Sequence, residues 1–99
     1  MPGITAIVAA NDLLALGCYD VLAERGLRCP DDVSVVGFND MPFADRFDPP
    51  LTTVRIPHRE IGSAAAGILL ARLGGDDGAA PQVRLPPAFV ARGSTAPPR

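Results

Sequence analysis

Two asparagines, each followed by an aspartate, have the residue types and the spacing to bind a small polar molecule. Asn11-Asp12 follows the apolar run Thr5–Ala9, and Asn39-Asp40 follows the β-branched run Val33–Phe38. An amide donates and accepts hydrogen bonds and a carboxylate accepts them, so such pairs suit sugars and nucleosides. Each pair also fits a purely local role, because asparagine and aspartate favour turns and helix N-termini. Their chemistry therefore depends on whether the fold brings the two pairs together.

The elements around the two pairs predict that they do meet. Thr5–Ala9 has the composition of a strand buried on both faces, and Val33–Phe38 predicts a second strand. Between them lies a helix that begins at an N-cap, either Asn11 or Asp12, and ends at Gly26. Strand, helix and strand make a right-handed parallel βαβ unit, whose ligands bind at the carboxyl ends of the strands. The expected fold class is α/β, a partial doubly wound parallel sheet with a further helix and strands.

The first predicted helix is apolar on more than one face. Leu13 and Leu16 form either a surface for a partner subunit or a face covered by neighbouring loops. A different stripe is expected to pack on the sheet, and it consists of Leu14, Gly17, Cys18, Val21 and Leu22.

The rest of the chain predicts one more helix and further extended segments. Residues 41–50 are rich in proline and aspartate and form an irregular connection, whereas residues 51–56 alternate as a third strand. A helix follows from about residue 57 to 73, with a seam of Ile61, Ala64, Ala65, Ile68 and Leu69. Residues 83–85 and 89–91 are expected to form a hairpin-like or extended pair, and the tail 93–99 is expected to fray.

Composition argues against several classes of function. The 99 residues hold one domain at most, the net charge is −2, and the nine arginines form no basic cluster, which speaks against direct nucleic-acid binding. No apolar run approaches the roughly 18 residues of a membrane span, and a signal-peptide pattern is missing. Cys18 and Cys29 lack metal-ligand and disulfide spacing, so we expect neutral thiols, no metal and no cofactor.

Residues for catalysis are also missing, so the chain is not expected to be an enzyme. The serines lie in no nucleophile elbow, and neither a P-loop nor Gly-x-Gly-x-x-Gly occurs. His58 is the only histidine and begins the second predicted helix, where a solvated or capping residue is more typical than a catalytic base.

Four segments, in order and at suitable spacing, resemble the effector-binding domain of LacI/GalR-type bacterial transcriptional regulators. They are ANDLLALG at 10–17, PDDVSVVGFND at 30–40, PLTTV at 50–54, and the stretch from LPP to VARGST at 85–95. The first segment is shared with periplasmic sugar-binding proteins, whereas the set with the closing Arg-x-Ser-Thr is specific for the regulators. The resemblance implies a periplasmic-binding-protein-like fold, in which residues 1–92 are the C-terminal portion of the domain.

The resemblance also implies roles for single residues. Asn11 matches the family's ligand-contacting asparagine, and Asn39 stands where many members have an aspartate that binds effector hydroxyls. His58 matches a position near the pocket that is often aromatic. Asp12 is then expected to cap the helix, and Asp40 to support its loop.

A complete member of the family has a helix-turn-helix headpiece and earlier strands upstream of the segments matched here. We therefore expect a fragment of a cytoplasmic regulator that supplies one wall of a small-molecule site, with a sugar as effector. DNA would be bound only through a headpiece missing from this chain. Leu13 and Leu16 would belong to the surface of a homodimer. A fragment of a sugar-transport solute-binding protein and an orphan α/β interaction module are the alternatives.

Overall fold

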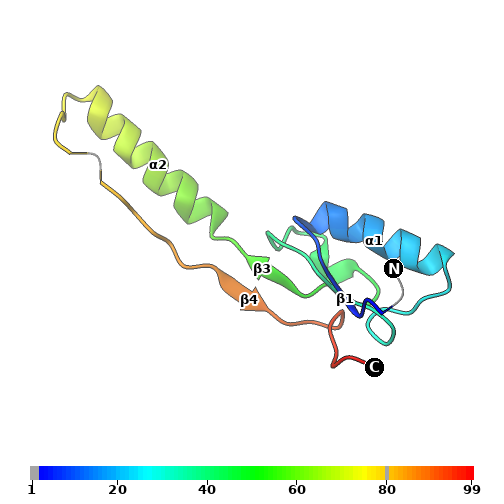
Figure 1. The fold of residues 1–99 in the computed structure, drawn as a ribbon. Coiled ribbons are helices and arrows are strands. Elements are labelled where there is room, and N and C mark those ends of the chain that lie inside the picture. Colours follow the sequence, from blue (N-terminus) through cyan, green and yellow to red (C-terminus); the bar gives the residue numbers. More distant parts are fainter. Residues whose placement is uncertain (1–2, 80) are drawn as a thin grey trace. The chain divides into compact units, whose positions relative to one another are not determined.

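The computed structural model describes residues 3–79 and 81–99 and has an α/β architecture (Figure 1). Two compact units are present: the first comprises the chain up to Ile56 together with Ala88–Arg99, and the second comprises Pro57–Pro87. The elements, in chain order, are β1 (Ala6–Val8), α1 (Asp12–Glu24), β2 (Ser34–Val36), the 3-10 helix η1 (Ala44–Arg46), β3 (Thr53–Arg55), α2 (His58–Leu73) and β4 (Ala88–Val90).

The first unit contains the predicted parallel βαβ arrangement. β1 pairs in parallel with β2, with Ala6 opposite Ser34. Parallel bridges at Val36–Thr52 and Asn39–Arg55 connect the end of β2 to the β3 segment, and β4 pairs with β3 in the antiparallel direction. The α/β prediction is therefore confirmed, with one antiparallel strand beside the parallel ones.

Helix α1 packs on the core through a face that coincides only in part with the one predicted. Leu14 and Val21 are about half exposed, at 54% and 47%, whereas Ala15 and Leu22 are buried. Asp12 is also buried and hydrogen-bonded within the unit, which holds this face inward. The predicted stripe was therefore wrong for Leu14 and Val21, whereas Leu22 belongs to the core and Cys18 packs against it, as expected. The buried core consists of Ala9, Ala15, Leu22, Val33, Val35, Ala44 and Leu51.

Strand β1 is not buried on both faces as expected. Ile7 packs against the core, whereas Val8 is 80% exposed. Among the residues that the structure describes, the core contacts only the Ile7 side of this strand. The prediction that the strand is buried on both faces, made from its apolar composition, was therefore wrong for one face.

The C-terminal segment corrects two further expectations. Residues 89–91 do not pair with residues 83–85, because β4 pairs with β3 instead. The tail 93–99 does not fray: Ser94 is fully buried, and the Val35 N–H donates to its carbonyl oxygen at 2.9 Å. The Ala96 N–H donates to Ser34 Oγ at 3.0 Å. Hydrogen bonds of the backbone thus hold the tail along β2, where the sequence showed only a proline-rich end.

The second unit consists of α2 and the segment that follows it. The helix begins after Pro57 and ends at Gly74, and Gly75 has a φ of 98°, as the predicted glycine stop requires. Not one residue of α2 is buried. Four residues of the predicted seam line a groove beside the segment that follows the helix. The groove is lined by Ile61, Ala64, Ala65, Ile68, Pro81, Val83 and Leu85. None of the helices in the described part of the chain is long and apolar enough to cross a membrane.

Candidate functional site

Asn11 lies at the carboxyl end of β1 and caps helix α1. Its Oδ1 accepts a hydrogen bond from the Leu14 N–H at 2.8 Å, and its backbone is extended, with a φ of −159°. Asn11 is therefore the N-cap, and the expectation that Asp12 caps the helix was wrong. Capping occupies the amide oxygen, so the amide nitrogen is the group with which Asn11 can donate to a ligand.

Asn39 lies three residues beyond the end of β2, at the same edge of the parallel pair. Its backbone N–H donates to the Val54 carbonyl at 2.9 Å. A second bond joins the two strand ends: the N–H of Asp12, which follows Asn11, donates to the carbonyl of Phe38, which precedes Asn39, at 3.2 Å. The backbone turns sharply here, with φ of 114° at Asn39 and 56° at Asp40. The fold thus brings the two asparagine-bearing strand ends together, as predicted.

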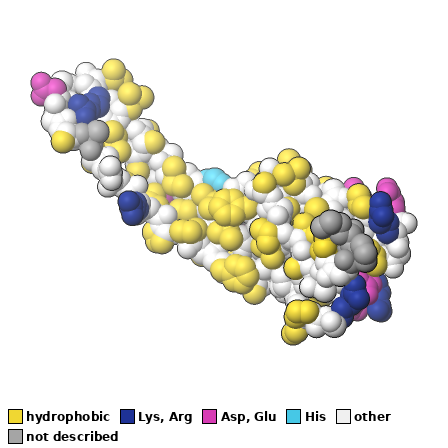
Figure 2. All heavy atoms as spheres, in the orientation of Figure 1, with side chains coloured by type: hydrophobic (Ala, Val, Ile, Leu, Met, Phe, Trp, Pro, Cys, Tyr) yellow, Lys and Arg dark blue, Asp and Glu magenta, His cyan; other side chains and the backbone are white. Residues whose placement is uncertain are grey.

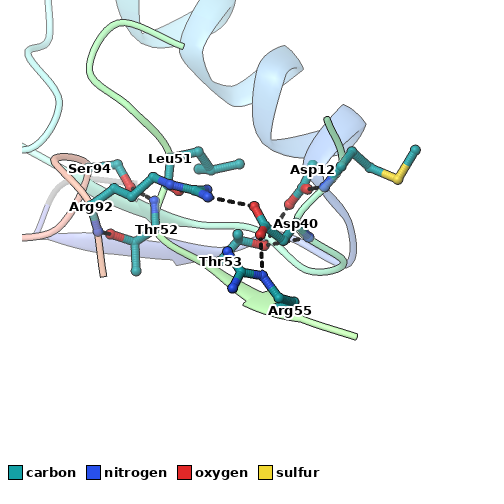
Figure 3. A network of polar contacts seen from close by, with 9 residues as sticks. Asp12, Asp40, Leu51, Thr52, Thr53, Arg55, Arg92 and Ser94 are labelled. Carbon is teal, nitrogen blue, oxygen red and sulfur yellow. Dashed lines mark hydrogen bonds and ion pairs between the residues drawn. The ribbon is translucent and has the colours of Figure 1, made fainter. Parts of the chain in front are cut away.

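Asp12 is a buried carboxylate that holds the loop after β2. Thr53 Oγ1 donates to its Oδ1 at 2.7 Å, and the Met41 N–H donates to its Oδ2 at 2.6 Å (Figure 3). The carboxylate packs directly against Gly37. A Cβ on Gly37 would come within 2.7 Å of Leu51 Cδ2 and closer still to Asp12, so only glycine fits. Asp12 therefore supports the loop from the first turn of the helix.

Asp40 accepts hydrogen bonds from two arginines that lie on different segments. Arg55 Nε lies 2.8 Å from its Oδ2, and Arg92 Nη2 lies 2.7 Å from its Oδ1 (Figure 3). Burial acts to raise the pKa of Asp40, but the hydrogen bonds and charges of the two arginines outweigh it and hold the pKa below its usual value. Asp40 is thus a charged contact point between its loop and the segments that carry Arg55 and Arg92.

Ser94 and Thr52 connect the C-terminal segment to the centre of the site. The Thr52 N–H donates to Ser94 Oγ at 2.8 Å, and Ser94 Oγ donates to the Val35 carbonyl at 2.6 Å. The Arg92 N–H donates to Thr52 Oγ1 at 2.9 Å, and this oxygen also lies 3.0 Å from Thr95 Oγ1. Among the described residues, no buried side-chain polar atom lacks a hydrogen-bond partner. This polar network links β2, the residue before β3 and the segment that follows β4.

The remaining predicted residues lie elsewhere. His58 is exposed at the start of α2, in the second unit, so its relation to the two asparagines stays a prediction. Leu13 and Leu16 are 63% and 41% exposed. The described loops therefore leave this face of α1 open, where it lines an apolar groove with Phe43, Arg46 and Phe47.

The cysteines are both free and half-buried. Burial raises the pKa of the Cys29 thiol, which agrees with the neutral thiol expected there. Among the described residues, no group of three His, Cys, Asp or Glu side chains is arranged to hold a metal ion.

Five polar residues of this network were not predicted. The Arg-x-Ser-Thr sequence at 92–95 carries part of the family resemblance, and the threonines at 52 and 53 fit the alternation of a strand. Two adjacent threonines in a strand place one hydroxyl on each face, and a hydroxyl buried in a core needs a partner. That signal could have been used. The missed residues are Thr52, Thr53, Arg55, Arg92 and Ser94.

A parallel βαβ unit with polar side chains at the carboxyl ends of its strands is typical of small-molecule binding domains. The chain matches the periplasmic binding protein-like domain family over residues 1–95. The relatives it resembles are bacterial regulators. The chain therefore belongs to the LacI family of transcriptional regulators, which are not enzymes, and forms part of their periplasmic-binding-protein-like domain.

Two relatives illustrate the match in sequence. The chain is 47% identical over 89 residues to the lactose operon repressor of Rhizobium radiobacter. This match covers 90% of this chain and 78% of that protein. It is 47% identical over 92 residues to the HTH-type transcriptional regulator MalR of Streptomyces coelicolor. This match covers 93% of this chain and 27% of MalR.

Solved structures agree with the sequence comparison. A LacI family regulator from Enterococcus faecium with bound ribose matches with a TM-score of 0.90 at 36% identity, over 98% of this chain and 36% of that one. The CelR–cellobiose complex matches with a TM-score of 0.89 at 34% identity, over 94% and 28% of the two chains. A dimeric Lac repressor has a TM-score of 0.86 at 37% identity, over 96% and 35%. The chain thus spans roughly a third of the solved regulators and about a quarter of MalR.

Proposed function

We propose that this chain supplies one wall of the sugar-binding site of a LacI-type transcriptional regulator, through Asn11 and Asn39. The observation that carries the proposal is the placement of these two amides at the ends of adjacent parallel strands, joined by the bond between the Asp12 N–H and the Phe38 carbonyl. Amide groups pair with the hydroxyl groups of sugars in both directions. Two structural relatives were solved with ribose and with cellobiose. His58 is a further candidate contact.

In the proposed regulator, this part of the protein senses the effector and a separate headpiece binds DNA. Effector binding favours one arrangement of the domain over another, and the headpieces respond to that change. The chain carries a net charge of −2, and its arginines are scattered along the sequence, which fits a sensing role and not direct DNA contact. A regulator that acts on bacterial DNA works in the cytoplasm.

Exposed apolar side chains support the view that these residues pack against further protein. Val8 on β1 is 80% exposed and Phe89 on β4 is 67% exposed, and hydrophobic side chains reach the surface on the visible face (Figure 2). Large apolar side chains at the surface mark contacts with other protein when they form patches. We assign the groove lined by Leu13, Leu16 and Phe47 to a homodimer surface.

The effector site can be tested by nuclear magnetic resonance, because the chain has only two asparagines and one glutamine, Gln82. Protein labelled with ¹⁵N at asparagine and glutamine is titrated with ribose, then with cellobiose. We expect both asparagine side-chain signals to shift at millimolar sugar, since a single wall buries little of the ligand. Gln82 belongs to the second unit and is no part of the proposed pair of asparagines, so its side-chain signal serves as the internal control.

Two outcomes would count against the effector site. Unchanged asparagine signals up to the solubility limit of both sugars would refute it, and so would equal shifts at Gln82. As a matched variant, Asn39→Ala should abolish the shift at Asn11 if both side chains bind one molecule.

The dimer surface has a separate test. Leu16→Glu places a charge in the groove, and we expect it to convert a concentration-dependent dimer into a monomer in analytical ultracentrifugation. Leu70→Glu, on α2, is the matched control because Leu70 is 67% exposed and lies outside the groove. A monomeric wild type at high concentration, or equal dissociation in both variants, would contradict the assignment.

A further inference from the structure

The turn after β2 has a backbone conformation that residues with side chains rarely adopt. Asn39 and Asp40 both have positive φ, 114° and 56°, and neither is glycine. Such conformations persist only where surrounding contacts enforce them, and they cluster at sites that bind ligands.

Three sets of contacts hold this turn: one made by Asn39 itself, the bond from the Met41 N–H to Asp12 described above, and the contacts of Asp40. The Asn39 N–H donates to the Val54 carbonyl at 2.9 Å. The Asp40 side chain is only 9% exposed, and it lies between the guanidinium groups of Arg92 and Arg55 at 2.7 and 2.8 Å (Figure 3). The side chain of Arg92 is 18% exposed and that of Arg55 is 58% exposed. Arg92 is thus the better shielded partner of the two.

Arg92 also connects Asp40 to the strand beside it. Its Nη1 donates to the Leu51 carbonyl at 3.0 Å while its Nη2 donates to Asp40 Oδ1 (Figure 3). A planar guanidinium can serve two acceptors at fixed geometry, whereas the single ammonium group of lysine is a point charge on a flexible stem. One side chain therefore sets the position of Asp40 relative to the residues that precede β3.

We propose that Arg92 and Asp40 are positioning residues for the effector site: by fixing Asp40, they hold Asn39 in its left-handed conformation and so order its amide before the effector arrives. This inference rests on the proposed effector role of Asn39. Arg55 adds a second contact to the same carboxylate. An amide that is already ordered loses less conformational freedom on binding, which improves affinity.

The side chain of Arg92 can be changed without removing the backbone contacts of this segment. The Arg92 N–H bond to Thr52 Oγ1 and the pairing of β4 with β3 involve other atoms. In Arg92→Met, we expect the φ-dependent couplings of Asn39 to move towards those of negative φ. The Asn11 signal should stay unchanged, because its cap bond runs to Leu14. Arg92→Lys should restore the contact to Asp40 and give an intermediate result.

Each variant is labelled with ¹⁵N at asparagine in the same way, and the φ-dependent couplings of Asn39 are measured in all of them. If Arg92→Met does not fold, Arg55→Met supplies the test, because Arg55 is exposed and its loss leaves the Arg92 contact in place. It should shift the Asn39 couplings in the same direction but less. Wild-type couplings at Asn39 in every folded variant would overturn the proposal, since the arginines would then hold the chain together without affecting Asn39.

A ribose titration of the wild type and of Arg92→Met separates this inference from the proposed function. We expect the dissociation constant to rise roughly tenfold in the variant, because Asn39 must then be ordered on binding. Equal affinity despite altered Asn39 couplings would overturn the positioning role. A wild type that responds to neither ribose nor cellobiose would refute the proposed effector site, and with it the functional part of this inference. The couplings would still show whether Arg92 fixes the conformation of Asn39.

Discussion

Replacing Ser94 with alanine tests whether the C-terminal segment is an integral part of the first unit. Ser94 is fully buried, and its hydroxyl has two partners, the Thr52 N–H at 2.8 Å and the Val35 carbonyl at 2.6 Å. Ser94→Ala leaves the buried Thr52 N–H without an acceptor, which costs about 1–3 kcal/mol, and removes a second bond worth about 1 kcal/mol. We therefore expect the free energy of unfolding to fall by about 2–4 kcal/mol, a large share of the stability of a small domain.

The assay is urea unfolding followed by the fluorescence of Tyr19, the only tyrosine in a chain without tryptophan. Tyr19 lies in the same unit and donates to the Pro49 carbonyl at 2.7 Å, so its signal reports this unit. With a slope of about 1–2 kcal/mol per molar urea, a loss of about 2 kcal/mol lowers the midpoint by roughly 1–2 M.

Ser63→Ala is the matched control, because it makes the same chemical change on the exposed surface of α2. It should change stability by no more than about 0.5 kcal/mol. A Ser94→Ala midpoint within the error of the wild type would refute the reasoning, since the tail would then contribute nothing to the stability of the unit.

Two further predictions concern the same network. Gly37→Ala should destabilise the first unit by about 1–3 kcal/mol in the same urea assay, because its Cβ would overlap Leu51 and Asp12; a neutral effect would contradict the close packing. The pKa of Asp40 is lower in the folded state than in the unfolded chain, so its contribution to stability is present above the ordinary carboxyl pKa and is lost as the pH falls through the folded value. Asp40→Asn should therefore show a smaller loss of unfolding free energy than the wild type between pH 6 and pH 3; equal losses would refute this account.

The βαβ unit could be predicted because its signals are local. Two apolar runs, a capping asparagine and a stop at Gly26 lie close together in the chain, and each agrees with the next. The same local signals placed Asn11 and Asn39 at one edge of the sheet. They also gave the boundaries of α2, because the pair Gly74-Gly75 ends it.

The burial of individual faces could not be predicted, because it depends on partners far away in sequence. Leu14 and Val21 have the right spacing for a buried stripe, but α1 is rotated so that Asp12 reaches Thr53, which lies 41 residues later. Likewise, Ser94 is held by Val35 across 59 residues. Composition marks a proline-rich end as mobile, and only the tertiary hydrogen bonds show that this one is fixed.

The first unit is discontinuous in sequence, and this affects when it can form during synthesis. A ribosome makes the chain from its N-terminus, so β1, α1 and β2 emerge well before the residues that complete their hydrogen bonds. Val35 and Thr52 gain their bonds to residue 94 only after the whole second unit has been made. At the rate of protein synthesis, about 5–20 residues per second, that delay lasts for seconds. During that time the nascent chain exposes incomplete strands, so a premature stop before Ser94 should yield a chain that chaperones and proteases engage.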